Sequence, residues 1–260
     1  MRIKIFSILA SGLLALSSIA FAGGHKKDSD PIDAFFNQIP GEFSSDVSLA
    51  SDYAFRGVSQ TGASPAIQGS FGYSLGLQDQ FKSPIPINLY TSVWGSNVNF
   101  GSTDDSQIEM NLTPGINTEI NGVSIDFYTI WYIYPDTSGS GNDYVEYAGG
   151  LGYDFGFASL GISYTYSPDY TVNAGEFHYF GASVSVPLPY KFTLDGTVGT
   201  GSFEREAGVD FTDWSIALSR DIRGFTLSGK YVANDMNDTD DCGGVGNCDT
   251  RGIFSISKSF

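Results

Sequence analysis

The chain has 260 residues, of which 41% are hydrophobic, 15% aromatic and only 16% charged. Its 13 Lys and Arg against 29 Asp and Glu give a net charge of −16, which excludes a protein that binds nucleic acid through a basic surface. The 32 glycines and the shortage of strong helix formers argue against a helix bundle, and the aromatic content argues against disorder. This composition favours an all-β protein.

Residues 1–22 are predicted to be a secretory signal peptide. Arg2 and Lys4 precede an apolar run, and Ala20-Phe21-Ala22 provides a cleavage site of small residues. Cleavage after Ala22 removes two bases and leaves 11 bases against 29 acids, a charge of −18. No later stretch has the ~20 apolar residues that a membrane helix needs, so the mature chain is either soluble or crosses a membrane as strands.

Residues 23–42 are predicted to be a periplasmic segment with one short amphipathic helix. Asp30 precedes Pro31 as an N-cap precedes a first-turn proline, and Pro40 ends the pattern. Four apolar residues between them share one helix face: Ile32, Phe35, Phe36 and Ile39. We expect this helix to pack as a lid on one end of the following domain, with a plug or an interfacial anchor as the alternative.

Residues 43–260 alternate apolar and polar side chains with a period of two, which predicts antiparallel β-strands. The pattern gives about twelve strands of ~10 residues, the length of a tilted bilayer crossing. Tight breaks, such as Asn121-Gly122 and Arg223-Gly224, alternate with longer polar loops, such as 135–143 and 234–250. The sequence therefore predicts a transmembrane antiparallel β-barrel. Two features fit less well: the longer break at 79–84 and Pro114 inside a strand.

The face of each strand opposite the apolar row carries charge, which suits a wet lumen as well as it suits a solvated outer face. The candidate pore-lining residues on this face are Asp52, Arg56, Glu109, Glu119, Asp126, Glu146, Asp154, Lys191, Asp195 and Lys230. Tyr and Phe gather near strand ends, which is typical of an aromatic girdle at a membrane interface: Tyr53, Phe55, Tyr132, Tyr134, Tyr144, Tyr147, Tyr164, Tyr166, Phe177 and Tyr179. The terminal Phe260 ends an amphipathic strand and is similar to the assembly signal of outer-membrane barrels.

One motif carries a family resemblance. Residues 51–60 read S-D-Y-A-F-R-G-V-S-Q and are followed by P-A-I-Q-G-S-F at 65–71. The pair resembles the opening hairpin of the TorF-type porins, which are Gcw_chp-type outer-membrane proteins of Gram-negative bacteria. The resemblance implies an outer-membrane barrel with a pore role, and it brings no catalytic or binding residues with it.

Asp52 and Arg56 lie four residues apart in that motif. Read as one strand, the motif places both on the non-lipid face about 13 Å apart, too far to pair with each other. Each is then expected to pair across strands inside the barrel wall, or Arg56 lies at the pore mouth. A role for the two residues in a pore constriction is the alternative.

Cys242 and Cys248 are the only cysteines, and their even number in an exported chain predicts a disulfide that closes a small loop. The same loop is rich in acids. Asp238, Asp240 and Asp249 match positions 1, 3 and 12 of a calcium loop, but Cys242 occupies position 5 and no Glu stands at position 12. We expect this loop to attract divalent cations only loosely, and we assign no metal site and no cofactor.

The sequence favours an outer-membrane channel for passive diffusion of small hydrophilic solutes, with a cation preference because acids exceed bases on the lumen face. Its expected partners are outer-membrane lipid, the assembly machinery and the solutes. The alternatives are a non-conducting structural or adhesin barrel and a lipid hydrolase with a Ser-His pair. For the hydrolase, His178 is the one candidate base, but no G-x-S-x-G element accompanies it, so we predict no enzymatic activity.

Overall fold

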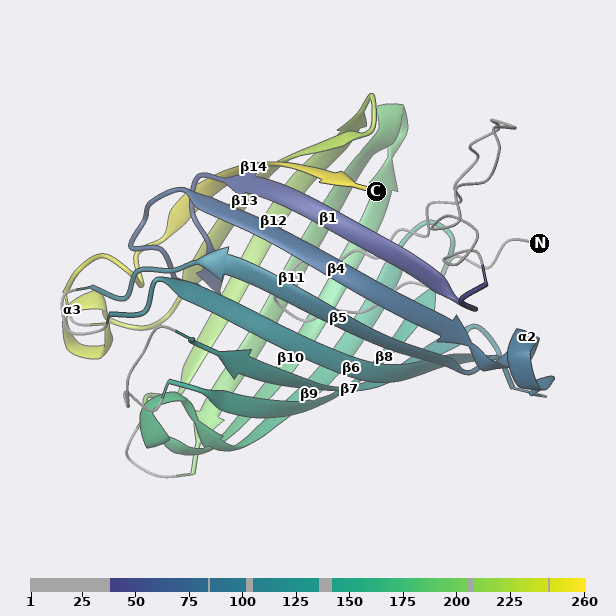
Figure 1. Cartoon of the computed structure of the whole chain (residues 1–260). Helices are drawn as coiled ribbons and strands as arrows, with labels where there is room; N and C mark the ends of the chain where they lie inside the picture. Colours follow the sequence, from purple (N-terminus) through teal and green to yellow (C-terminus); the bar gives the residue numbers. More distant parts are fainter. Residues whose placement is uncertain (1–37, 84, 102–104, 136–141, 205–207, 243) are drawn as a thin grey trace.

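The computed structural model describes residues 38–83, 85–101, 105–135, 142–204, 208–242 and 244–260. These residues form a closed barrel of twelve antiparallel strands, with β1 and β4 paired to close the order β1-β14-β13-β12-β11-β10-β9-β8-β7-β6-β5-β4 (Figure 1). The barrel strands are β1 (Glu42–Ala50), β4 (Ala66–Gly76), β5 (Asn88–Asn97), β6 (Ile108–Ile120), β7 (Val123–Ile133), β8 (Tyr144–Asp154), β9 (Ser159–Tyr170), β10 (Gly175–Leu188), β11 (Phe192–Phe203), β12 (Phe211–Ile222), β13 (Phe225–Asn234) and β14 (Arg251–Ser259). The predicted fold is confirmed.

The barrel turns its apolar side chains outward. In β10, Phe177 and Tyr179 are 0% and 3% exposed and face the lumen, whereas the neighbouring Phe180 is 57% exposed. Large apolar residues of the other strands are exposed on the outer face in the same way, whereas the buried residues include many polar and charged ones, such as Glu109 and Glu146. Water-soluble proteins have the opposite arrangement, so this distribution is that of a barrel with a lipid-facing exterior.

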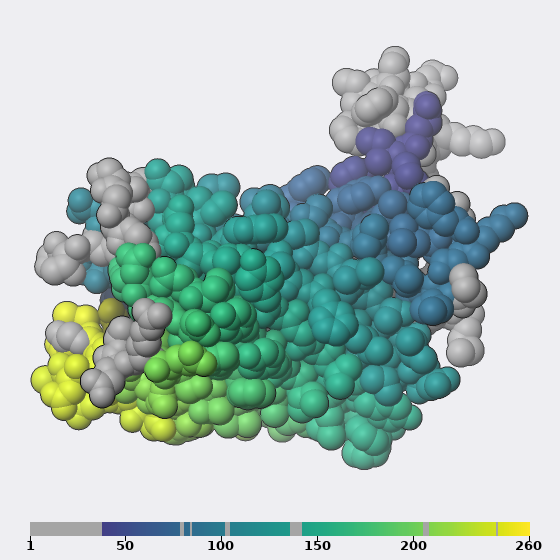
Figure 2. Space-filling view, turned by 90° about the horizontal axis from the view of Figure 1, so that it is seen from below, coloured from purple at the N-terminus to yellow at the C-terminus, as the bar shows by residue number. Residues whose placement is uncertain are grey.

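The two ends of the barrel differ, as Figure 1 shows. At the turn end, β6 meets β7 through Asn121-Gly122 and β12 meets β13 through Arg223-Gly224, and all four residues have positive φ, as a type I′ turn requires. At the loop end, longer segments connect the strands. The outer wall is continuous in Figure 2, with the yellow loop of 235–250 at one end and the blue segment around α2 at the other.

The two irregular features of the sequence have local solutions. The longer break between β4 and β5 holds a one-turn helix, α2 (Leu77–Phe81), instead of a tight turn. Pro114 lies within β6, where it pairs in register with Thr91 of β5, and the β6–β7 pairing is interrupted between Leu112 and Gly115. The proline nitrogen cannot donate a hydrogen bond to a neighbouring strand, so the interruption of the β6–β7 pairing lies at the proline.

The predicted length of the first strand is wrong, because only its first half lies in the barrel wall. The periodicity predicts one strand through Arg56, but β1 ends at Ala50. The chain then leaves the wall and forms a separate two-stranded sheet of β2 (Ala54–Phe55) and β3 (Val58–Ser59) before it returns at β4. Asp52 and Arg56 are therefore not on a barrel strand.

The last loop contains the predicted disulfide between Cys242 and Cys248, with Cα atoms 6.1 Å apart, beside the short helix α3 (Asp238–Asp241). The carboxylate of Asp238 accepts hydrogen bonds from the backbone N–H groups of Gly246 and Cys248 (2.9 and 3.2 Å). Asp238 therefore holds the loop together, and its carboxylate oxygens are less available to bind a cation. None of the helices in the described part of the chain is long and apolar enough to cross a membrane.

The predicted signal peptide and most of the predicted N-terminal segment lie outside the described residues. The domain boundaries at 22 and 42 stay predictions.

Gly199 of β11 offers a test of lumen packing. The Tyr179 ring lies over this glycine, and a Cβ at position 199 would overlap the Tyr179 hydroxyl, which donates to Asp213 (2.7 Å). We expect Gly199→Ala to lower the free energy of unfolding by about 1–3 kcal/mol, because it displaces the ring and breaks this bond. Gly252→Ala is the matched control, since a Cβ there meets nothing within 4 Å. Urea unfolding in detergent measures both, and equal stability of the two variants would contradict the packing.

Candidate functional site

The segment between β1 and β4 folds into the barrel lumen at the loop end and forms the candidate site. We call residues 51–65 the lumen hairpin. Its turn is Arg56-Gly57, with φ of +47° and +82°, the same type I′ geometry as the turns at the opposite end of the barrel. Gly57 packs so closely that a Cβ would come within 2.7 Å of Asn234 Cβ, and its carbonyl accepts from Asn234 Nδ2 (2.8 Å).

Arg56 is the central residue of the lumen hairpin. Its guanidinium donates two hydrogen bonds to the Glu146 carboxylate (2.6 and 3.0 Å), and the two side chains are 5% and 1% exposed. A third bond reaches the Tyr170 hydroxyl (3.4 Å). Such a bidentate pair fixes orientation as well as distance. Because Glu146 belongs to β8, the pair ties the tip of the hairpin to the barrel wall.

Aromatic rings surround the Arg56 guanidinium. Its carbon lies 4.6 Å from the centre of the Phe55 ring, 5.0 Å from Phe177 and 4.4 Å from Tyr179. Burial lowers the pKa of Arg56, but the charge and hydrogen bonds of Glu146 together with Tyr170 and Tyr132 outweigh burial, and the net pKa is raised well above its usual value. The guanidinium therefore stays charged inside an aromatic cage, where desolvation strengthens cation–π attraction.

Asp52 forms the second anchor of the hairpin. Its carboxylate accepts from the hydroxyls of Ser59 and Thr61 (2.7 and 2.6 Å) and from Arg251 Nη1 of β14 (2.8 Å). Arg251 also donates to the carbonyl of Asn247 (2.8 Å), which in turn accepts from Ser59 N (2.8 Å). This network connects the hairpin to the last loop.

Tyr53 forms the third anchor, on the side of β5 and β6. Its hydroxyl donates to Glu109 of β6 (3.3 Å), which also accepts from Asn111 and Tyr134 (2.8 and 3.4 Å). Burial and the charge of Glu109 raise the pKa of Tyr53, so its hydroxyl keeps its proton and remains a donor. Tyr53, Ala66, Val98, Tyr132 and Tyr134 pack together as a buried apolar cluster.

The ten candidate pore-lining residues fall into three places. Asp52 and Arg56 are in the lumen hairpin, and Glu109 and Glu146 hold it. Further along the strands, Asp126 accepts from the Tyr90 hydroxyl (2.9 Å), and Asp195 and Lys230 are half-buried. The last three, Glu119, Asp154 and Lys191, are exposed near the turns. The structure thus brings four of the ten residues together and separates the rest.

The aromatic-girdle interpretation is wrong for half of its residues. Tyr53 of the hairpin and its neighbours Tyr132, Tyr134, Phe177 and Tyr179 are at most 9% exposed, whereas Tyr147 and Tyr164 are exposed on the outside. Sequence reasoning also missed Tyr170, Asn234 and Arg251 as contacts of the hairpin. The available signal was Arg56-Gly57 itself, a two-residue turn of the kind that joins strands.

Two further predicted features have clear positions. His178 lies on the outer face, with Nδ1 hydrogen-bonded to the Tyr164 hydroxyl (2.7 Å) and Nε2 3.7 Å from Glu204. Both ring nitrogens therefore face partners other than the serine that a hydrolase pair needs. Phe260 is 51% exposed, and its backbone exchanges hydrogen bonds with Ser45 of β1 (2.9 and 3.3 Å).

The closed wall, apolar exterior and polar interior define the molecule as a transmembrane β-barrel. The family model described as "Bacterial protein of unknown function (Gcw_chp)" matches residues 37–260. The chain belongs to this family. The comparison with curated proteins gives no match.

Solved structures of similar fold include two porins and one enzyme. The NanC porin is 13% identical with a TM-score of 0.52, covering 84% of this chain and 99% of that one. The KdgM porin in complex with disordered oligogalacturonate is 10% identical with a TM-score of 0.52, covering 84% and 99%. An active-site mutant of outer membrane phospholipase A from Escherichia coli is 7% identical with a TM-score of 0.51, covering 90% and 94%. At these identities the likeness shows the fold alone.

Trypsin can test the Arg56–Glu146 pair, because Arg56-Gly57 is itself a tryptic bond. We expect Glu146→Gln to expose this bond to cleavage, since an unpaired buried guanidinium is costly and drives the hairpin out of the lumen. Mass spectrometry identifies the cut, and heat-modifiable gel mobility shows that the barrel stays folded. Glu119→Gln is the control, because that carboxylate is exposed near a turn. A folded Glu146→Gln barrel that resists cleavage at Arg56 would contradict the anchoring role.

Proposed function

We propose that the chain is a channel of the bacterial outer membrane, of the TorF porin type, for passive diffusion of small hydrophilic solutes. The lumen hairpin is its constriction. The apolar exterior contacts outer-membrane lipid, and the final strand with Phe260 is the segment that the assembly machinery recognises.

The proposal rests on one observation: the side chains that face the lumen around the hairpin differ from those that face it beyond the hairpin. The apolar cluster packs against the hairpin at the loop end. Beyond the hairpin the inward face carries small polar residues that are half-buried or exposed, including Ser183, Thr197, Ser215 and Ser219. A barrel that serves only as a scaffold can fill its interior with large side chains. A face of short hydroxyl side chains instead supports a water-filled path that narrows at the hairpin.

The charge of the inward face favours cations. Carboxylates of Glu109, Asp126, Asp195 and Asp213 lie on it beside one lysine, Lys230, and Glu146 is neutralised by Arg56. A lumen with surplus negative charge raises the local concentration of cations and repels anions. We therefore propose neutral or cationic solutes, which differ from the polyanionic oligogalacturonate in the KdgM complex.

A non-conducting barrel that acts through its acidic loops is the second candidate. The observation in its favour is the hairpin itself, because buried anchors on several sides hold it across the lumen. The two candidates predict different currents. A channel conducts while the hairpin is in place and conducts more once the hairpin is released.

Single-channel recording in a planar bilayer separates these candidates. We expect the refolded parent protein to conduct and Arg56→Ala to conduct more with a noisier open level, because the freed hairpin no longer narrows the lumen. Arg223→Asn is the control: it removes a guanidinium from an exposed turn at φ +53°, where asparagine fits. Absence of current in both the parent and Arg56→Ala would overturn the channel proposal.

The reversal potential under a salt gradient tests selectivity. We expect cation preference in the parent and a smaller preference in Asp195→Asn, because this variant removes one half-buried lumen carboxylate that makes no ion pair among the described residues. Asp221→Asn, at an exposed position near a turn, is the matched control and should keep the parental value. Anion preference in the parent would contradict the assignment.

A further inference from the structure

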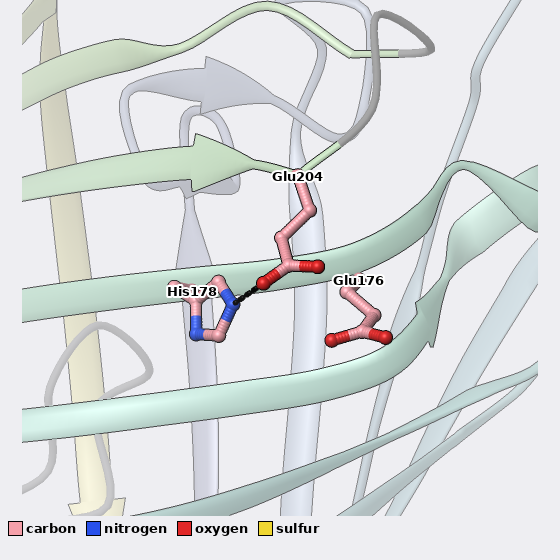
Figure 3. A group of neighbouring side chains, drawn as sticks. All are labelled: Glu176, His178 and Glu204. Carbon is pink, nitrogen blue, oxygen red and sulfur yellow. Dashed lines mark ion pairs between the residues drawn. The ribbon is translucent and has the colours of Figure 1, made fainter.

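Three potential metal ligands meet on the outer face of the barrel at the loop end. Glu176 and His178 lie in β10, and Glu204 directly follows β11 (Figure 3). Phe177, between the first two, is fully buried and faces the lumen, so alternation places its neighbours on the outside. Their ligand atoms all lie within 4.8 Å of one another. This group is separate from the lumen hairpin.

The strand register brings these side chains together. The backbone N–H of Glu204 donates to the carbonyl of Glu176 (3.2 Å), so the two glutamates face each other across the β10–β11 pair. His178 pairs with Ser202 in the same ladder, one step along the same face. The backbones of all three ligand residues are thus fixed by strand pairing.

Two tyrosines of β9 orient the group. The Tyr164 hydroxyl bonds to His178 Nδ1 (2.7 Å), and the Tyr166 hydroxyl donates to Glu176 (3.3 Å). When Nδ1 carries the proton and donates to Tyr164, the lone pair of Nε2 faces the carboxylates. Metal-binding histidines are commonly held in this way through their second nitrogen.

The group has unbalanced charge. Like charges directly opposite each other in a sheet are destabilising. Among the described residues, neither Glu176 nor Glu204 has a Lys or Arg within ion-pair distance; Arg205 lies outside the described residues. Figure 3 shows Glu204 reaching over His178, with Glu176 beside the pair. A bound cation between the carboxylates would relieve their repulsion.

We propose that Glu176, His178 and Glu204 bind one divalent transition-metal ion of the zinc class on the outer rim of the barrel. Imidazole and carboxylate are both zinc ligands, and three protein ligands leave a fourth position open to water. The ligand bonds of ~2.0–2.2 Å require the side chains to close slightly. Glu204 can make this movement because its side chain is 59% exposed. The imidazole distinguishes this site from calcium sites, which use oxygen ligands.

Calorimetric titration of the full refolded chain with ZnCl₂, after treatment with chelator, tests the proposal. We expect binding of one ion that is lost in His178→Gln and in Glu204→Gln, with Ca²⁺ unable to compete at equal concentration. Tyr164→Phe should weaken binding by about 10-fold while the barrel stays folded, because it removes the partner that orients His178. Glu119→Gln, which removes a carboxylate at an exposed distant position, should bind as the parent does.

Each contrary result has a defined meaning. Parent protein that binds no zinc shows that His178 and Glu204 form only a surface ion pair, which overturns the site. Zinc binding unchanged in both His178→Gln and Glu204→Gln places the ion elsewhere, such as the acidic loop of 234–250, and overturns it equally. A loss of the same size in Glu119→Gln shows general charge attraction instead of a site.

Discussion

The buried pair of Arg56 and Glu146 is the interaction on which the interior of this barrel depends. Removing one partner of such a pair typically costs about 3–5 kcal/mol, because the other is left as an isolated buried charge. The guanidinium can remain in the lumen only while Glu146 faces it and the rings of Phe55, Phe177 and Tyr179 surround it. This contact holds the tip of the hairpin against β8.

The barrel could be predicted from the sequence because its cause is local. A strand between lipid and a polar lumen must alternate apolar and polar side chains, and the alternation is visible within any ten residues. Tight turns are equally local: Asn121-Gly122 and Arg223-Gly224 have the residues and the positive φ that a type I′ turn needs. The strand number and the disulfide follow from such short-range patterns, and closure follows because a sheet in a membrane cannot leave an edge unpaired.

The hairpin could not be predicted in the same way, because its causes are distant in sequence. Glu146 lies 90 residues from Arg56, and Arg251 lies 199 residues from Asp52. The alternation of apolar and polar side chains over residues 47–55 shows no break at Ala50, where the chain leaves the barrel wall. Tyr and Phe added a second ambiguity, since an aromatic residue near a strand end can face the lipid interface or the lumen. Only the closed barrel decides between these directions.

The motif S-D-Y-A-F-R-G-V-S-Q acquires a physical explanation from these contacts. Asp52, Tyr53 and Arg56 each anchor the hairpin to a different part of the barrel. The Arg56 anchor contacts the same short stretch of β10 that carries two of the three ligands of the proposed metal site. Phe177 and Tyr179 face inward against Arg56, whereas Glu176 and His178 face outward. An ion bound outside would therefore hold in place the strand that carries two of the three rings of the aromatic cage inside, because adjacent residues of one strand share its backbone and differ only in the face they reach.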